Sequence, residues 1–300
     1  MFQVLLAALR RTVPALLALA AWPLHAADLP DLRQAGDPVL QQGLEHVVAD
    51  LGLTPDVQRG DLALSLVDIT DAQHPRMAML NGDEMLYAAS LPKIAILLGA
   101  FVEAERGRLV LDADRMATIT QMIRVSSNQA ATTVLGWVGG ERLIDILQSP
   151  KFGFYDARGA GGLWVGKPYG PGGAYRRDPL HNLSHGATAF QVARFYQMLD
   201  ANALVNPELT AKMKDVMSHP GIVHKFVKGM LERPGVAMFR KSGSWQDTHA
   251  DSALVEANGR KYIMVGLAHN ARGGDWLVRL APRLHDLVMG VPPATHVASR

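Results

Sequence analysis

The sequence predicts an α/β (α+β) fold, in which an antiparallel sheet built from both ends of the chain is flanked by helices and carries an inserted all-α lobe. Two observations favour this arrangement. Strand-like runs occur near the start of the chain, at 62–69 and 76–80, and near its end, at 236–242, 250–256 and 262–268. Apolar residues at helical spacing dominate the residues between these two groups. A sheet assembled from both termini around a helical insertion follows.

The first residues are typical of an export signal. Arg10 and Arg11 form a charged start, residues 13–24 form an apolar stretch, and Ala26 offers a small residue for cleavage. The apolar stretch is too short to be a transmembrane helix. We therefore expect residues 1–26 to be removed and the mature protein to be periplasmic or secreted. The alternative is that the segment is retained as an N-terminal anchor.

Charge and cysteine content exclude several classes of protein. The 300-residue chain has a formal charge of +2, and cleavage removes two arginines and no acid, so the mature net charge is zero. A neutral surface gives no reason to expect nucleic acid or an anionic membrane as a partner. Without cysteine the protein forms no disulfide, no thiolate metal site and no cysteine nucleophile. No glycine fingerprint for a dinucleotide follows a predicted strand, so no cofactor is expected.

The N-terminal third contains a helix, the first two strands and a second helix. Residues 38–53 carry apolar side chains near helical spacing, and Asp37 supplies a cap before them. The two strands are joined by a polar turn. A helix over 90–107 follows, with Pro92 in its first turn, where the missing N–H costs nothing.

The middle of the chain is predicted to be mainly helical, with one long loop. The predicted helices are 112–138 with a break near Ser126, 141–147, 187–200 and 207–217. Eight glycines between residues 153 and 173 are too many for a packed helix or strand, so that stretch should be a loop.

Three strands and a helix over 275–289 close the fold, and Asn258 with Gly259 is a hairpin signal between the last two strands. We divide the chain into a signal peptide, 1–26, an α/β sheet lobe, 27–95 with 225–300, and a helical lobe, 96–224. The two lobes together form one domain, 27–300.

Three short motifs carry the chemistry of the chain. They are Ser90 with Lys93, Ser126 with Asn128, and the run Lys241, Ser242, Gly243. Among 11 serines and 9 lysines, only Ser90 has a lysine three residues on, where chance gives about 0.3 such pairs. Chance gives about 0.3 for the second motif and about 0.06 for the third, so all three together arise at odds on the order of 1 in 200.

A serine hydroxyl becomes a nucleophile when a neighbour takes its proton and donors hold the oxyanion that forms. Ser90 and Lys93 are three residues apart at a helix start, so both side chains lie on one face. The helix N-terminus favours a neutral lysine and a developing anion there. In the alternative interpretation, Ser90 only caps the helix and Lys93 is a solvated residue of the first turn.

The motifs in this order resemble those of class A β-lactamases and the related penicillin-binding D,D-peptidases, whose signature is S-x-x-K, S-D-N and K-T-G. Ser127 stands where the family has Asp, and Ser242 stands where it has Thr. The predicted hairpin after the third motif also agrees with the family. The similarity extends in outline over nearly the whole mature chain, so it implies one catalytic domain of β-lactamase/transpeptidase-like fold.

The resemblance implies a role for each motif residue. Its catalytic set is Ser90 as nucleophile, Lys93 as its proton partner, Ser126 as a relay to the leaving nitrogen, and Lys241 as positive charge for the substrate carboxylate. Its substrate-binding set is Asn128 for the substrate amide, Ser242 for the carboxylate, Gly243 beside it, and Ser244, whose N–H completes an oxyanion hole with that of Ser90. Trp245 either walls the pocket or packs at the lobe interface.

The chain departs from class A enzymes in the loop after the second motif, because no glutamate lies between Glu141 and Glu208. In class A enzymes a glutamate in this loop activates the water that removes the acyl group. The candidate substitutes are Asp178, His181 and His185. Alternatively, Asp178 caps its loop or pairs with Arg176 or Arg177, and the histidines bond to backbone. A metal site at the two histidines is disfavoured, because Pro179 and Gly186 interrupt any helix that would align them.

These patterns predict an exported serine hydrolase of class A β-lactamase type that is acylated on Ser90 by a β-lactam or a D-Ala-D-Ala-like amide. Its partner would be a small β-lactam or a peptidoglycan stem peptide. One alternative is a penicillin-binding D,D-peptidase, and a second is an esterase or amidase that uses the same serine and lysine. A third is a pseudoenzyme that binds cell-wall peptides without turnover.

Overall fold

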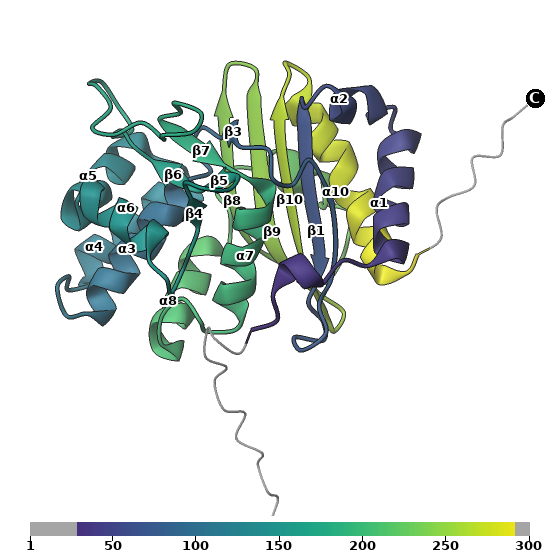
Figure 1. Cartoon of the computed structure of the whole chain (residues 1–300). Coiled ribbons are helices and arrows are strands. Elements are labelled where there is room, and N and C mark those ends of the chain that lie inside the picture. Colours follow the sequence, from purple (N-terminus) through teal and green to yellow (C-terminus); the bar gives the residue numbers. More distant parts are fainter. Residues whose placement is uncertain (1–28, 292–300) are drawn as a thin grey trace, which may run out of the picture.

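A five-stranded antiparallel sheet forms the centre of the molecule (Figure 1) in the computed structural model, which describes residues 29–291. The strand order is β2-β1-β10-β9-β8, so strands from both ends of the chain lie side by side. The strands are β1 (Leu62–Asp68), β2 (Arg76–Leu80), β8 (Val236–Trp245), β9 (Thr248–Ala257) and β10 (Arg260–His269). The predicted fold class is confirmed. The expected export signal, residues 1–26, lies outside the described residues.

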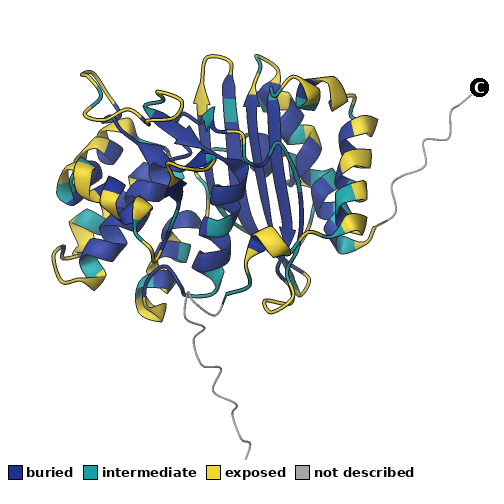
Figure 2. Ribbon diagram, viewed as in Figure 1, coloured by how far each residue is buried: buried dark blue, intermediate teal, exposed yellow. Residues whose placement is uncertain are grey.

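Helices cover both faces of this sheet (Figure 1). Helices α1 (Pro38–Asp50) and α10 (Gly273–Met289) pack on one face, and α7 (Ala189–Asp200) packs on the other. Successive side chains of a strand point to opposite faces, so Leu64 joins the core beneath α1 and α10, while Ala63 joins the core beneath α7. Every residue of β1 is therefore buried, and Figure 2 shows exposure mainly on the outer helix surfaces and the loops.

Local signals in the sequence set the ends of these elements. The side chain of Asp37 accepts the N–H of Leu40 at 2.7 Å and caps α1, as predicted. The β9–β10 turn places Asn258 at φ 48° and Gly259 at φ 76°. Both angles lie in the left-handed region that a two-residue hairpin turn requires, which is why Asn-Gly marks this turn.

The inserted lobe consists of helices packed around α3. They are α3 (Lys93–Glu105), α4 (Ala113–Arg124), α5 (Asn128–Val138), α6 (Gly140–Gln148) and α8 (Pro207–Met217). Helix α3 is buried on nearly every side, because α4, α5, α6 and α8 all contact it. The predicted break near Ser126 separates α4 from α5. Between residues 29 and 291 no helix is both long and apolar enough to cross a membrane.

The described residues also include short elements that the sequence did not predict. They are a 3-10 helix (Leu32–Gln34), α2 (Thr54–Gln58), α9 (Lys225–Gly229), β3 (Leu86–Tyr87), β4 (Tyr155–Asp156), β5 (Gly161–Gly162), β6 (Trp164–Val165) and β7 (His185–Ala187). The stretch 153–173, expected to be loop alone, thus contains three two-residue strands. Gly162 permits this pairing, since it has φ 147° and a Cβ there would lie 2.0 Å from the carbonyl oxygen of Phe154.

Candidate active site

Ser90 lies in a tight turn immediately before α3. The N–H of Leu91 donates to the carbonyl of Ala88 at 3.0 Å, and the N–H of Lys93 donates to the carbonyl of Ser90 at 3.3 Å. Ala89 has φ 50°, a left-handed conformation that a residue with a side chain adopts at a cost. The regular helix therefore begins at Lys93, three residues later than the sequence predicted, and Ser90 remains only half-buried.

The edge strand β8 lies directly against this turn. A Cβ on Gly243 would lie 2.2 Å from the carbonyl oxygen of Ala88 and 2.8 Å from the backbone nitrogen of Ser90. Only glycine allows the two backbones to approach so closely. Strand β8 is the last strand of its sheet, so its outer edge has no strand partner. The backbone of β8 at Gly243 therefore lies against the backbone nitrogen of Ser90, and the predicted oxyanion-hole donor Ser244 is the next residue along the strand.

Lys93 is fully buried and points to the second motif. Its Nζ donates to the carbonyl of Ser126 at 2.6 Å and to Oδ1 of Asn128 at 2.8 Å, and it lies 3.3 Å from Oγ of Ser126. Burial lowers the pKa of Lys93 to about 7. A large share of this amine is therefore neutral at neutral pH and able to accept a proton. Among the described residues, no hydrogen bond joins it to Ser90.

Lys241, on the sheet strand β8, contacts the hydroxyl of Ser126 as well. Its Nζ donates to Oγ of Ser126 at 2.9 Å and to the carbonyl of Ser242 at 2.6 Å. Burial, and next the charge of Lys93, hold the pKa of Lys241 well below its usual range. Ser126 itself adopts φ 59°, an uncommon conformation that places its hydroxyl between the two amines. This arrangement can pass a proton between either lysine and a substrate atom near Ser126 Oγ.

The departure from the S-D-N motif preserves the local structure. Ser127 caps α5, since its Oγ accepts the N–H of Ala130 at 3.1 Å. Asn128 begins the helix, and its side-chain oxygen is held by Lys93 as described above. The short polar cap therefore does what an aspartate would do at a helix N-terminus.

Two site residues, His224 and Lys225, were missed by the sequence reasoning. Nε2 of His224 lies 3.0 Å from Oγ of Ser242. Nζ of Lys225 donates to the carbonyl of Gly243, to Oγ of Ser244 at 2.7 Å and to the carbonyl of Ala250 at 3.1 Å. Burial lowers the pKa of His224 to about 4 and that of Lys225 to about 8. The only signal in the sequence was a histidine-lysine pair, of which the lysine stands 16 residues before Lys241.

Tyr169, from the glycine-rich stretch, was also missed. It is buried, its hydroxyl donates to the carbonyl of Ala89 at 3.0 Å, and its ring centre lies 4.6 Å from Nζ of Lys93. The ring also packs on His185, with ring centres 4.2 Å apart. Its own carbonyl accepts from Oγ1 of Thr132 at 3.0 Å. Tyr169 therefore holds the loop against the turn that contains Ser90, and its ring covers one side of Lys93.

Asp178, the first candidate for the missing base, organises its own loop. It is 2% exposed, and its carboxylate accepts the hydroxyl of Tyr155 and the N–H groups of Leu180, His181 and Leu183 at 2.9–3.1 Å. Burial alone would raise the pKa of Asp178, but these hydrogen bonds hold it below its usual range. The alternative capping role thus fits its contacts. Among the described ion pairs, Arg176 pairs instead with Glu141 at 2.9 Å.

The two candidate histidines occupy different environments. His185 is buried on β7, its Nε2 bonds to the carbonyl of Lys167 at 2.9 Å, and burial lowers its pKa to about 4. It is therefore neutral at pH 7, and the ring of Tyr169 packs against it at a tilt of 39°. His181 is exposed. Trp245 is 61% exposed at the tip of β8, so it does not pack at an interface between the lobes.

Comparison with known proteins agrees with this fold. The family described as "Beta-lactamase enzyme family" matches residues 115–286, a range that includes the second and third motifs and begins after Ser90. No curated protein matches the chain.

Solved structures resemble the chain over most of its length. A β-lactamase from Sphaerobacter thermophilus DSM 20745 is 16% identical with a TM-score of 0.65, over 84% of this chain and 98% of that one. PBP-A is 16% identical with a TM-score of 0.64, over 87% and 99%. A PBP-A mutant, as an acyl-enzyme complex with penicillin G, is 18% identical with a TM-score of 0.64, over 85% and 97%. The family match spans more than half of the chain, which therefore belongs to the β-lactamase enzyme family.

Proposed function

We propose that the protein is an exported serine hydrolase that is acylated on Ser90 by β-lactams or by D-Ala-D-Ala-like amides. The observation that carries this proposal is the meeting of three segments far apart in the sequence. The turn at Ser90, the start of α5 and the edge strand β8 are joined by Gly243 and by the two lysines on Ser126. Such a site holds the groups that acyl transfer requires and that simple binding does not.

Acylation would begin with attack of Ser90 Oγ on the carbonyl carbon. Lys93, neutral in part at pH 7, takes the serine proton directly or through Ser126. The N–H groups of Ser90 and Ser244 hold the oxyanion. Ser126 then gives its hydroxyl proton to the leaving nitrogen and recovers one from Lys93 or Lys241, both of which contact its Oγ.

A substrate carboxylate would bind at the third motif. Lys225 supplies positive charge there, Lys241 binds the carboxylate in its protonated form, and Ser242 supplies a hydroxyl that His224 orients. Charge-assisted hydrogen bonds of this kind are about twice as strong as neutral ones. β-Lactams and D-Ala-D-Ala peptides share such a carboxylate on the leaving side, so both fit the same geometry.

Deacylation is where the site differs from an efficient β-lactamase. Asp178 is occupied by its loop, His185 is bonded to a backbone carbonyl, and Tyr169 covers the adjacent side of Lys93. Because Asp178 is engaged by its loop and the sequence has no glutamate between Glu141 and Glu208, we expect the acyl-enzyme to persist. This favours a penicillin-binding D,D-peptidase acting on peptidoglycan stem peptides as the second candidate function.

Covalent labelling tests the proposal. A fluorescent penicillin should label the purified protein and remain attached through denaturing electrophoresis. Ser90→Ala should abolish the label, while Ser218→Ala, at a half-buried serine that follows the C-terminal end of α8, should leave it unchanged. Equal labelling of wild type and Ser90→Ala would refute the assignment of the nucleophile. Export is part of the proposal and is tested by fractionating cells that express the full chain.

A further inference from the structure

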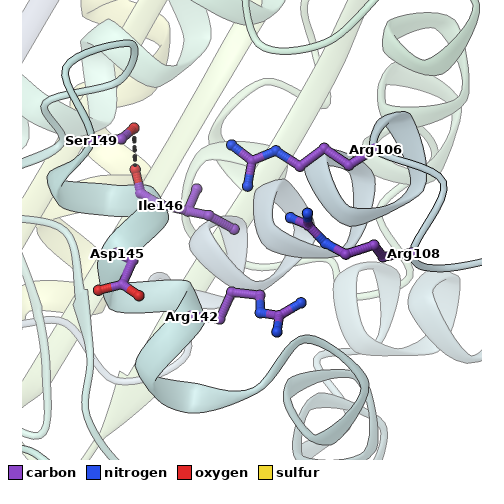
Figure 3. Close-up of a pocket in the computed structure, with 6 residues that line it drawn as sticks. All are labelled: Arg106, Arg108, Arg142, Asp145, Ile146 and Ser149. Carbon is purple, nitrogen blue, oxygen red and sulfur yellow. Dashed lines mark hydrogen bonds between the residues drawn. The ribbon is translucent and has the colours of Figure 1, made fainter.

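A polar cavity, shown in Figure 3, lies beside the C-terminal end of α3, the helix that begins at Lys93. It has a volume of about 410 Å³ and is lined by Arg106, Arg108, Arg142, Asp145, Ile146 and Ser149. Helix α3 has 13 residues, so at about 1.5 Å per residue the cavity is roughly 20 Å from the catalytic lysine. It is therefore separate from the proposed active site.

A single buried carboxylate organises the arginines of this cavity. Glu103, whose side chain is 3% exposed, accepts from Arg108 Nε at 2.6 Å, from Arg108 Nη2 at 2.7 Å and from Arg142 Nη1 at 2.9 Å. Nη1 of Arg106 lies 3.5 Å from Oε1 of Glu103, the oxygen that also accepts from Arg108 Nη2. The hydrogen bonds from Arg108, chiefly, lower the pKa of Glu103 to about 2, so this carboxylate stays ionised.

The cavity nevertheless has a surplus of positive charge. Three guanidinium groups face one buried carboxylate, and Asp145 on the wall forms no ion pair among residues 29–291. Each guanidinium has five N–H donors, most of which Glu103 leaves unused. The side chains of Arg106, Arg108 and Arg142 are 44%, 46% and 52% exposed, so these donors are accessible from solvent.

Figure 3 shows the three guanidinium groups converging from two directions, Arg106 and Arg108 from the end of α3 and Arg142 from α6. Like charges held so close repel each other, and an anion between them relieves that repulsion. The planar fork of arginine binds phosphate oxygens in pairs, which a lysine cluster does not do. Glu103 fixes the forks in advance, so little side-chain entropy remains to be lost on binding.

We propose that this cavity is a binding site for a phosphate group, carried by free phosphate, by a soluble phosphate ester or by a lipid headgroup. The site is independent of acylation at Ser90, and its test does not depend on the proposed function.

Isothermal titration of the purified protein with inorganic phosphate and with pyrophosphate tests the site. The variant is Arg106→Gln with Arg142→Gln, which keeps both hydrogen bonds from Arg108 to Glu103. The matched control is Arg158→Gln with Arg279→Gln, which removes two exposed arginines elsewhere. We expect saturable binding by wild type and control, and affinity lower by at least about tenfold in the cavity variant. Should the double variant unfold, Arg106→Gln alone is used, with an expected loss of at least about threefold.

Vesicles distinguish the source of the phosphate. Sedimentation with phosphatidylglycerol vesicles that depends on the cavity arginines indicates a lipid headgroup, whereas phosphate binding without vesicle binding indicates a soluble ligand. The proposal is overturned if the wild-type protein binds neither phosphate nor vesicles, or if the cavity variant and the control bind them equally.

Discussion

Gly243→Ala should push the edge strand β8 away from the turn that contains Ser90. The added Cβ would lie 2.2 Å from the carbonyl oxygen of Ala88 and 2.8 Å from the backbone nitrogen of Ser90. Ordinary contacts between such atoms are at least about 3.2 Å, so the two backbones must move apart by roughly 1 Å. Gly243 does not have a positive φ, so alanine brings no backbone strain of its own and the effect is steric.

A shift of this size misplaces one donor of the proposed oxyanion hole. Loss of one such donor costs about 100- to 1,000-fold in rate, and overpacking costs about 1–3 kcal/mol of stability. We therefore expect the rate constant for acylation by benzylpenicillin to fall by about 100-fold or more. Stopped-flow kinetics measures the rate, and thermal unfolding measures the stability.

Gly136→Ala provides the matched control, since Gly136 lies within α5 and nothing lies within 4 Å of a Cβ there. It should leave acylation unchanged and stabilise the helix by up to about 1 kcal/mol. If folded Gly243→Ala is acylated at a rate within about threefold of wild type, the contact between Gly243 and the Ser90 turn does not position an oxyanion-hole donor.

Three further predictions concern the groups around the site. Tyr169→Ala should admit water beside Lys93 and shorten the acyl-enzyme lifetime by about tenfold or more. Tyr169→Phe keeps the ring and should leave the lifetime unchanged. Equal lifetimes of wild type and both variants would show that the ring does not shield the acyl group from water. The lowered pKa of Lys93 means that the base loses its proton near pH 7, so the acylation rate should rise with pH through about 7. A rise centred near pH 10 is what a lysine of ordinary pKa would give, and it would contradict the lowered pKa of Lys93. In the wild type the buried Arg240 donates to the carboxylate of Asp251 at 2.7 Å. Asp251→Asn removes this counter-charge and should lower the free energy of unfolding, measured in urea, by about 3–5 kcal/mol. A loss below about 1 kcal/mol would contradict this prediction.

Periodic patterns made most of the fold predictable from the sequence. Alternation and helical spacing located the five long strands and the main helices, and Asn258 with Gly259 identified a turn by its backbone requirements. These signals are local, so they can be recognised without knowledge of the tertiary structure. The predicted start of α3 was wrong, because residues 90–92 form a tight turn. Ala89 has a positive φ there, which an alanine in the sequence does not indicate.

The site was predictable only as far as its motifs extend. Ser90, Ser126 and Lys241 belong to short patterns whose spacing is improbable by chance. Tyr169 and Lys225 have no such pattern, since a glycine-rich stretch and the five-residue helix α9 bring them to the site through packing alone. The role of Asp178 depends equally on the fold of its loop, which aims three backbone N–H groups at its carboxylate.

Acylation at Ser90 is tested most directly by a time course of intact protein mass after mixing with excess benzylpenicillin, with Ser90→Ala in parallel. We predict a mass increase of one intact benzylpenicillin in the wild type, none in the variant, and an adduct that persists for hours. No adduct in the wild type, or an equal adduct in Ser90→Ala, would contradict acylation at Ser90. Loss of the adduct within seconds would contradict the persistent acyl-enzyme and reveal an efficient route for water.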